Sequence, residues 1–262
     1  MKYIIGSGWW CTDDKNNNRD RYYGDDTIRS AAFHREWLAS ITENTYSVKI
    51  CIIDSNSPIK PPLLPNNIIF ISLNENGGHA TQHTGKYSGW MRSVLHSMSY
   101  AQNSDCEYYV YVEQDVLLFG DGIIEFCISK MKKPYMFGKC NLFNNPLQQS
   151  FFIIKKDYID IFLSNIYSIK YRDSQINPEK KFAISTSRLY KFIPKFIFLT
   201  PKNRFLKKLT WRFQNILCKL FGNYQYLPVG YGRDRPINFD DSYYYFQHAS
   251  RDEINEYKSR KS

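Results

Sequence analysis

The sequence predicts an α/β fold in which a mostly parallel sheet is flanked by helices. Short apolar runs rich in β-branched and aromatic residues alternate with longer segments of helical periodicity. The run Tyr108–Val112 is β-branched or aromatic at every position, which is typical of a strand buried on both faces. Several of these runs end in polar or acidic residues, as expected where the strands of a parallel sheet end at one edge.

The length and the cysteines limit the possible organisation. A chain of 262 residues suits one large domain, or one domain with an appendage. Its six cysteines are scattered without the Cys-x-x-Cys spacing of a zinc site, so we expect reduced, buried thiols in a cytosolic protein. The apolar run at residues 1–6 is too short for a signal peptide, and no run approaches the ~18 apolar residues of a membrane span.

The first part of the chain alternates strands with helices. Strands are expected over residues 2–6, 48–53, 68–73 and 108–112, then over 135–138 and 148–154. Helices are expected over about 26–43, 87–101, 121–131 and 157–165. Asp25 and Asp26 precede the first helical pattern, as residues that cap a helix do.

The helical and strand patterns weaken after residue 167. Asn177-Pro178-Glu179 opens another helix, since proline is favoured at the first helical position and glutamate in the first turn. We therefore divide the chain into an α/β core over residues 1–166 and a C-terminal segment over 167–262. That segment either belongs to the same domain or forms a small appendage.

Three of the expected strands end in polar residues on what should be one edge of the sheet. The residues after the first, second and fourth strands are Ser7 and Gly8, then Asp54 and Asn56, then Glu113, Gln114 and Asp115. In open α/β sheets, ligands bind beyond the carboxyl ends of the strands. The three strand ends therefore predict a shared ligand-binding cleft.

Each acidic strand end also has a simpler interpretation. Glu113 and Asp115 are suited as oxygen ligands for a hard divalent cation, or they only cap a loop and form surface ion pairs. Asp54 either accepts a hydrogen bond from a base or ribose, or forms an Asx-turn before Pro58.

Motifs of several other enzyme classes are missing. Gly6-Ser7-Gly8 completes neither a P-loop nor Gly-x-Gly-x-x-Gly, which disfavours kinases and dehydrogenases. No Gly-x-Ser-x-Gly elbow occurs. His79 and His83 are four residues apart, but no glutamate follows His79, so a catalytic metal pair is not expected there.

Across residues 1–165, the order of elements resembles the GT-A nucleotide-sugar glycosyltransferases, broadly of the family-2 type. The resemblance rests on strand ends at Asp54-Ser55-Asn56-Ser57 and Asn74-Glu75-Asn76-Gly77-Gly78, a glycine-bearing helix start at 85–92, and the acidic strand end. It implies a GT-A-like, Rossmann-type sheet with a basic helical C-terminal extension. It also implies transfer of a sugar from a nucleotide-sugar donor to a glycan or lipid-linked acceptor, in the synthesis of a surface polysaccharide or glycolipid.

The resemblance also implies a metal site. In this family an Asp-x-Asp motif holds a divalent cation, Mn²⁺ or Mg²⁺, that bridges the donor diphosphate. Glu113-Gln114-Asp115 looks like that motif, with Asp115 on the metal. Glu113 departs from the pattern, and its longer side chain would reach the ribose or a metal-bound water. His248 looks like the C-terminal histidine that some members add to the metal; its alternative is a partly buried structural histidine.

A general base is implied in the same way. Inverting members place a carboxylate at a helix start after the metal motif, and Glu179 looks like that residue. Its alternative role is an interaction with the helix dipole. Asp240 and Asp241 are the competing bases.

Basic side chains would assist the departing diphosphate. Lys86 and Arg92 are candidates at the helix start, and Arg233 and Arg235 are candidates on a flexible tail that closes as a lid. The alternative for each of them is a solvated surface charge.

Residues 203–221 form an amphipathic basic pattern. Its apolar positions recur every three or four residues and comprise Phe205, Leu209, Phe213, Ile216, Leu217 and Leu220. Such a helix is typical of an interfacial membrane helix, which would hold the enzyme at the inner face of an anionic membrane. The alternative is a helix packed on the core with a solvated basic face.

Two other functions stay open. A nucleotidyltransferase acting on a sugar phosphate also uses sheet-edge carboxylates and a metal, but Ser7-Gly8-Trp9-Trp10 does not match its usual glycine-rich, basic loop. A nucleic-acid binder would explain the net charge of +10, but the positive charge gathers late in the chain and no nucleic-acid motif occurs. We therefore expect no nucleic acid among the partners.

Overall fold

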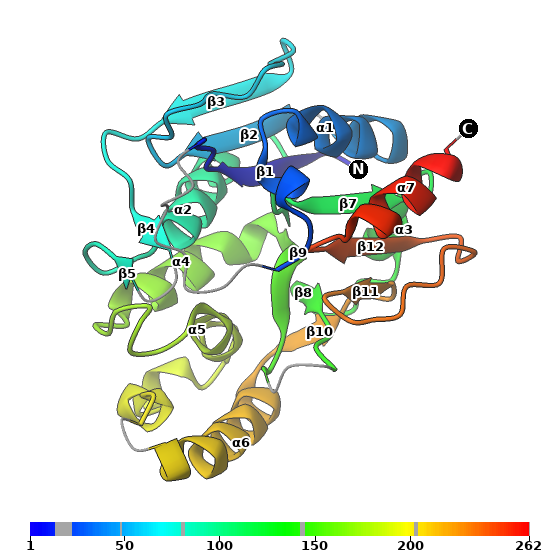
Figure 1. Cartoon of the computed structure of the whole chain (residues 1–262). Coiled ribbons are helices and arrows are strands. Elements are labelled where there is room, and N and C mark those ends of the chain that lie inside the picture. The colour runs from blue at the N-terminus through cyan, green and yellow to red at the C-terminus, as the bar shows by residue number, and fades with distance from the viewer. Residues whose placement is uncertain (14–22, 48, 80–81, 142–144, 202–203, 262) are drawn as a thin grey trace.

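The central feature of the computed structural model is a sheet of seven strands, in the order β10-β8-β9-β6-β1-β2-β3 (Figure 1). The model describes residues 1–13, 23–47, 49–79, 82–141, 145–201 and 204–261. The strands of the sheet are Tyr3–Trp9 (β1), Lys49–Asp54 (β2), Ile68–Ser72 (β3), Tyr108–Val112 (β6), Tyr135–Gly138 (β8), Gln148–Lys155 (β9) and Tyr224–Tyr226 (β10). Only β9 runs antiparallel to its neighbours, β6 and β8. The predicted α/β fold with a mostly parallel sheet is confirmed.

A second, smaller sheet joins the middle of the chain to its C-terminal part. It has the order β11-β12-β7, with bounds Gly230–Gly232 (β11), Tyr244–Gln247 (β12) and Val116–Phe119 (β7). Because β7 starts directly after the acidic tripeptide and β12 pairs antiparallel with it, the chain near residue 247 returns to the end of β6. The C-terminal segment thus supplies β10 to the central sheet and two strands to the small one. A hairpin of Gly78–His79 (β4) and Gln82–His83 (β5) precedes the second helix.

Helices cover both faces of the central sheet. They are Phe33–Asn44 (α1), Gly89–Gln102 (α2), Ile123–Ser129 (α3), Ile159–Ser168 (α4), Pro178–Ser185 (α5), Arg204–Phe221 (α6) and Arg251–Ser259 (α7). One apolar cluster joins the sheet to α2, α4 and α5, and a second joins its other face to α1 and α3. A third cluster packs α7 against the small sheet. No described helix combines the length and apolar character that a membrane crossing requires.

Four single-turn 3-10 helices complete the elements: Asp26–Arg29 (η1), Lys156–Tyr158 (η2), Tyr190–Phe192 (η3) and Lys195–Phe198 (η4). The first of them shows that the continuous helix predicted over 26–43 was wrong. Asp25 caps only η1, and the backbone is extended at Ser30, whose hydroxyl donates to the carbonyl of Thr27. A serine that bonds its own local backbone in this way competes with helix continuation.

The first strand is longer than predicted and ends at Trp9 rather than Gly6. Its two glycines allow α2 to pack closely against the backbone of this strand. A Cβ at Gly6 would lie 2.5 Å from Ser97 Oγ, and one at Gly8 would lie 2.6 Å from Ser93 Oγ, both on α2. The strand therefore uses glycine where a helix approaches its backbone. Five of the six cysteines are buried and none is in a disulfide; Val48 and the loop 14–22 lie outside the described residues.

Candidate active site

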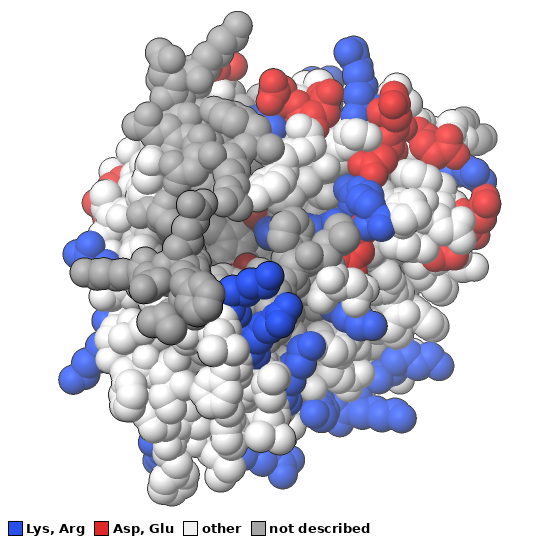
Figure 2. Space-filling view, turned by 60° about the horizontal axis from the view of Figure 1, so that its bottom comes forward, with Lys and Arg blue, Asp and Glu red and all other residues white. Residues whose placement is uncertain are grey.

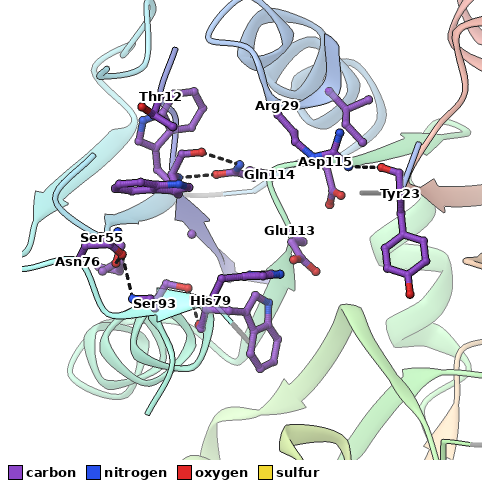
Figure 3. A pocket seen from close by; sticks show the side chains of 18 of the residues that line it. Thr12, Tyr23, Arg29, Ser55, Asn76, His79, Ser93, Glu113, Gln114 and Asp115 are labelled. Atoms are coloured by element: carbon purple, nitrogen blue, oxygen red, sulfur yellow. Dashed lines mark hydrogen bonds between the residues drawn. The ribbon is translucent and has the colours of Figure 1, made fainter. Parts of the chain in front are cut away.

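The acidic tripeptide forms the turn between the two sheets. The Glu113 N–H donates to the carbonyl of Ser150 on β9 at 2.9 Å, and the Val116 N–H closes the turn on the carbonyl of Glu113 at 3.0 Å. The Gln114 side chain bonds both the N–H and the carbonyl of Trp10, at 2.7 and 3.1 Å (Figure 3). Gln114 is therefore held against the backbone after β1, while its two acidic neighbours face the cavity.

That cavity has a volume of about 550 Å³ and lies beyond the carboxyl ends of β1, β2 and β6. Aromatic rings and polar groups alternate on its wall, which includes Gly8, Trp10, Tyr23, Ser55, Asn76, Trp90, Tyr111, Glu113, Gln114, Asp115 and His248. Large rings with a few placed polar groups are typical of small-molecule sites, and they suit sugar rings and bases. The ligand cleft expected at this edge is thus present as a cavity.

The C-terminal strand brings two side chains to the acidic tripeptide. The Gln247 amide nitrogen donates to Glu113 Oε2 at 2.9 Å and to Asp115 Oδ1 at 3.0 Å. His248 Nε2 lies 3.5 Å from Asp115 Oδ2, and its ring stacks on Tyr23 with centroids 5.1 Å apart. Gln247 was not among the residues predicted from the sequence. The available signal was the strand-like aromatic run before His248, which places a polar residue at the end of a buried strand.

Burial sets the protonation of this group. It raises the pKa of Glu113 to about 8, and the negative charge of Asp115 adds to the rise. It lowers the pKa of His248 to about 4, because desolvation outweighs the attraction of Asp115 and three arginines oppose the charged form. The imidazole is therefore neutral at neutral pH, the form in which histidine binds metals.

The residues present fit a divalent cation whose remaining ligands would be water and substrate phosphates. Within the described residues, no group of three or more His, Cys, Asp and Glu side chains is arranged to hold a metal. Asp115 and the neutral His248 offer one oxygen and one nitrogen 3.5 Å apart. Magnesium and similar ions usually take one or two protein ligands together with water and substrate phosphates, so two protein ligands suffice.

Glu179 lies at the first turn of α5, close to this group. Asn177 caps the helix through the Lys180 N–H, and Glu179 Oε1 accepts a hydrogen bond from Asn145 Nδ2 at 3.2 Å. Burial raises the pKa of Glu179, while the charge of Arg233 opposes the rise. Glu179 also contributes to the raised pKa of Glu113, so the two carboxylates lie within electrostatic reach. Among the described residues, Glu179 stands beside the cavity rather than on its wall.

Asp240 and Asp241, the competing bases, are engaged elsewhere. Asp240 forms an ion pair with Arg260 at 2.6 Å. Asp241 accepts hydrogen bonds from Tyr231 at 2.6 Å and from Asn238 at 2.8 Å. Neither aspartate lines the cavity. The structure therefore does not bring them to the acidic tripeptide.

Of the predicted donor-binding residues at the first two strand ends, only Gly8 reaches the cavity. Ser7 is buried in β1. Asp54 is fully buried and accepts from the Ser57 N–H at 2.9 Å and from Ser72 Oγ at 2.6 Å, with Lys60 as its ion pair. This is the structural role that was the alternative. The polar wall comes instead from Ser55 and Asn76, which sequence analysis missed; Asn56 turns to the carbonyl of Asn74.

Two basic residues near the start of α2 contact neighbouring segments of the chain. Lys86 Nζ donates to the carbonyl of Tyr167 at 2.7 Å. Arg92 pairs with Glu75 at 2.7 Å and donates to the carbonyl of Thr84 at 3.1 Å. Both side chains tie the segment before α2 to its neighbours, and neither lines the cavity.

The two arginines of the C-terminal segment are held by hydrogen bonds and an ion pair, and the flexible lid stays a prediction. Arg235 pairs with Glu253 of α7 at 2.5 Å and donates to the carbonyl of Gln247 at 2.8 Å. Arg233 Nε donates to Gln247 Oε1 at 2.9 Å. The charge of Arg233 acts on Glu113, Glu179 and His248, so this arginine belongs to the candidate site.

No family model and no curated protein matches the chain. Among solved structures, the galactosyltransferase LgtC in complex with donor and acceptor sugar analogues is 14% identical, covering 86% of this chain and 73% of that one, with a TM-score of 0.44. TarS of S. aureus is 10% identical, covering 94% of this chain but only 36% of that one, with a TM-score of 0.44. A cytidylyltransferase from Leptospira borgpetersenii is 8% identical, covering 87% and 75%, with a TM-score of 0.39. Glycosyltransferases and a nucleotidyltransferase are thus both among the solved structures similar to this chain.

Proposed function

We propose that the protein is a metal-dependent glycosyltransferase of the GT-A type. It transfers a sugar from a nucleotide-sugar donor to a hydroxyl of a glycan or lipid-linked acceptor. The observation that carries the proposal is the meeting of Asp115 and neutral His248 at the sheet edge, on the wall of a cavity rich in aromatic rings. A carboxylate and an imidazole suit Mn²⁺ or Mg²⁺, and the rings suit a base and a sugar.

In the proposed reaction, each charged residue near the acidic tripeptide has a role. The acceptor oxygen forms a bond to the anomeric carbon as the bond from that carbon to the diphosphate oxygen breaks, and the electron pair leaves with the diphosphate. Glu179 takes the proton of the acceptor hydroxyl, a role that its raised pKa favours. A divalent cation, when bound at Asp115 and His248, stabilises the negative charge of the departing diphosphate as a Lewis acid. Arg233 adds a fixed positive charge beside the carboxylates.

A thermal-shift screen tests this assignment. Nucleoside diphosphates are added to the full chain with and without Mn²⁺. One nucleotide is expected to stabilise the protein only with the metal, and Asp115→Ala is expected to abolish that shift. Metal-independent stabilisation that survives the substitution would contradict the proposal. Assaying release of a nucleoside diphosphate from a nucleotide sugar against release of pyrophosphate from a nucleoside triphosphate and a sugar phosphate then separates a glycosyltransferase from a nucleotidyltransferase.

We also propose that α6 seats the enzyme on an anionic membrane, at its inner face. Its outer face is apolar: Leu209, Phe213, Ile216 and Leu220 are 70, 53, 62 and 72% exposed. Its inner face is mixed: Gln214 and Asn215 are buried there, and Leu217, Cys218 and Phe221 pack on the core. A helix that is already packed on one side and presents a second apolar stripe to water on the other needs a further apolar contact.

The surroundings of α6 favour lipid as that contact. Phe192 and Phe196, on η3 and η4, add exposed rings of 82 and 63%. Lys208, Arg212 and Lys219 of α6 are exposed beside the apolar stripe. Figure 2 shows acidic side chains gathered at the upper right, whereas the lower half carries Lys and Arg among uncharged side chains. Basic residues around an apolar stripe match the acidic headgroups and acyl chains of a bilayer. The side chains of 204–207, including Phe205, lie outside the described residues.

A further inference from the structure

Gln247 hydrogen-bonds to both acidic side chains of the tripeptide. It is the last residue of β12, it is fully buried, and it stands opposite Val116 at the start of β7. Its one amide nitrogen donates to both carboxylates of the acidic tripeptide, at 2.9 Å to Glu113 and 3.0 Å to Asp115. An amide NH₂ carries two hydrogens, so these two bonds use its full donor capacity.

The orientation of this amide is fixed by a third contact. Arg233 Nε donates to Gln247 Oε1 at 2.9 Å. An arginine has only donors, so the amide oxygen must face Arg233 and the amide nitrogen must face the carboxylates. A flipped amide would set N–H groups against the guanidinium and an oxygen against two carboxylates. The contact with Arg233 therefore keeps both hydrogens of Gln247 on the acidic residues.

We propose that Gln247 is a positioning residue that fixes the side chains of Glu113 and Asp115 so that Asp115 faces the divalent cation; the inference rests on the proposed function. Each carboxylate gives one oxygen to the amide, Oε2 of Glu113 and Oδ1 of Asp115. The second oxygen of Asp115, Oδ2, faces His248. No hydrogen bond within the described residues occupies Glu113 Oε1. Hydrogen-bonding one oxygen of a carboxylate fixes the direction of the other, which is how a neighbour outside the ligand set tunes a metal site.

The same residue places the histidine. Gln247 and His248 are adjacent, and the Gln247 carbonyl accepts from Arg235, which is paired with Glu253 of α7. His248 adopts a left-handed backbone, with φ of 58°. Such a conformation is uncommon for a non-glycine residue and recurs at ligand sites. The anchored end of β12 thus holds the strand at the point where the chain turns the imidazole toward Asp115.

Mn²⁺ binding to the full chain tests the inference without relying on turnover. The free-ion signal of Mn²⁺ in electron paramagnetic resonance gives its Kd for each protein. Gln247→Met keeps the length and burial of the side chain and removes the amide. It is expected to raise the Kd by about 10- to 100-fold, the usual cost of losing a partner of the ligands. Gln247→Asn keeps an amide too short to reach both carboxylates, and should lose part of the affinity even if the methionine variant folds poorly.

Gln214→Met is the matched control. Gln214 is also a fully buried glutamine: its nitrogen donates to the carbonyls of Ile197 and Leu199 at 2.6 and 2.9 Å, its oxygen accepts from Lys180 Nζ, and it does not bond Glu113 or Asp115. It should leave the Kd for Mn²⁺ unchanged. Wild-type affinity in both Gln247 variants, or an equal loss in Gln214→Met, would overturn the inference. If the wild type binds no Mn²⁺, or Asp115→Ala binds it equally well, the proposed function fails too; a loss in Asp115→Ala alone isolates the failure to Gln247.

Discussion

The centre of the central sheet and one of its edges depart from ordinary burial in opposite ways. Near β6, polar and charged groups are taken out of water: Gln247 is fully buried, and burial shifts the pKa values of Glu113 and His248. At α6, near the edge strand β10, apolar side chains are left in water, with Leu220 72% exposed. Figure 1 shows α6 at the bottom of the molecule, far from β3 at the top.

Both departures cost stability in the isolated chain. Buried charges lose hydration, and exposed apolar side chains forgo the roughly 1.5–3 kcal/mol that burial of each would contribute. Sequences usually avoid such local conflicts except where function requires them. The comparison therefore indicates two functional surfaces of different chemistry. Under the two proposals above, a cation and a diphosphate would complete the polar surface, and lipid would complete the apolar one.

The largest effect is expected at the first surface. Glu179→Gln removes the group that takes the proton and should lower kcat by about 10²–10⁴-fold, with donor affinity retained. Burial raises the pKa of Glu179, so its charged form opposes folding at neutral pH, and the variant should be at least as stable as the wild type. Single-turnover kinetics and thermal unfolding measure the two effects. Full turnover in the variant would remove Glu179 as the base.

The second largest effect is expected at the apolar surface of α6. Changing Leu209, Phe213 and Ile216 together to serine removes three exposed side chains of α6. Binding to vesicles with anionic lipid should weaken by at least about 100-fold, because each side chain would lose its transfer into the bilayer. Flotation of the full chain with vesicles measures this.

The matched control for α6 lies at the opposite edge of the molecule. Leu63, Leu64 and Ile71 are also exposed, by 46, 41 and 40%, near or within β3. Their triple serine variant should float as the wild type does. Equal loss in both variants would show nonspecific adsorption. A concentration-dependent dimer that dissociates in the α6 variant, with no flotation, would show that a second copy of the chain covers this face.

Part of the candidate site could be predicted from the sequence, but not the contacts that bring its residues together. Asp115 was predictable because a buried strand ends in acidic residues, and strand ends share an edge. Gln247 was not, because it meets Asp115 across 132 residues through the pairing of β12 with β7. Local patterns do not specify which distant strands pair. Asp54 shows the opposite limit: the strand end could be predicted from the sequence, but its partners Lys60 and Ser72 could not.

The second surface was better specified by its own sequence. The spacing of Leu209, Phe213, Ile216 and Leu220 defines one face of a helix whatever the helix packs against. Periodicity did not determine whether that face points inward, because an apolar stripe normally covers the core. The other side of α6, where Leu217 and Cys218 lie with the buried Gln214, packs on the core, so the stripe is left facing away from it.

The pH dependence of catalysis tests whether Glu179 is the general base. A base acts when deprotonated, so kcat/KM should fall about tenfold per pH unit below the pKa of Glu179. Burial raises that pKa, so the fall should begin above the ordinary glutamate value of about 4.3. A profile measured between pH 4 and 9 would show this limb in the wild type. The limb should be missing in Glu179→Gln, and a limb that persists there would belong to another group.

The smallest effect separates the charges of α6 from its apolar stripe. Lys208→Gln, Arg212→Gln and Lys219→Gln each remove an exposed cation, and each should weaken binding to anionic vesicles by about 1 kcal/mol, or roughly fivefold. The loss should shrink as salt rises, because screening shortens the reach of surface charges. On vesicles without anionic lipid, the three variants should bind as the wild type does, while the serine variant of the stripe stays weak. Equal losses on both kinds of vesicle would mean that these residues act through the structure of α6 rather than through lipid charge.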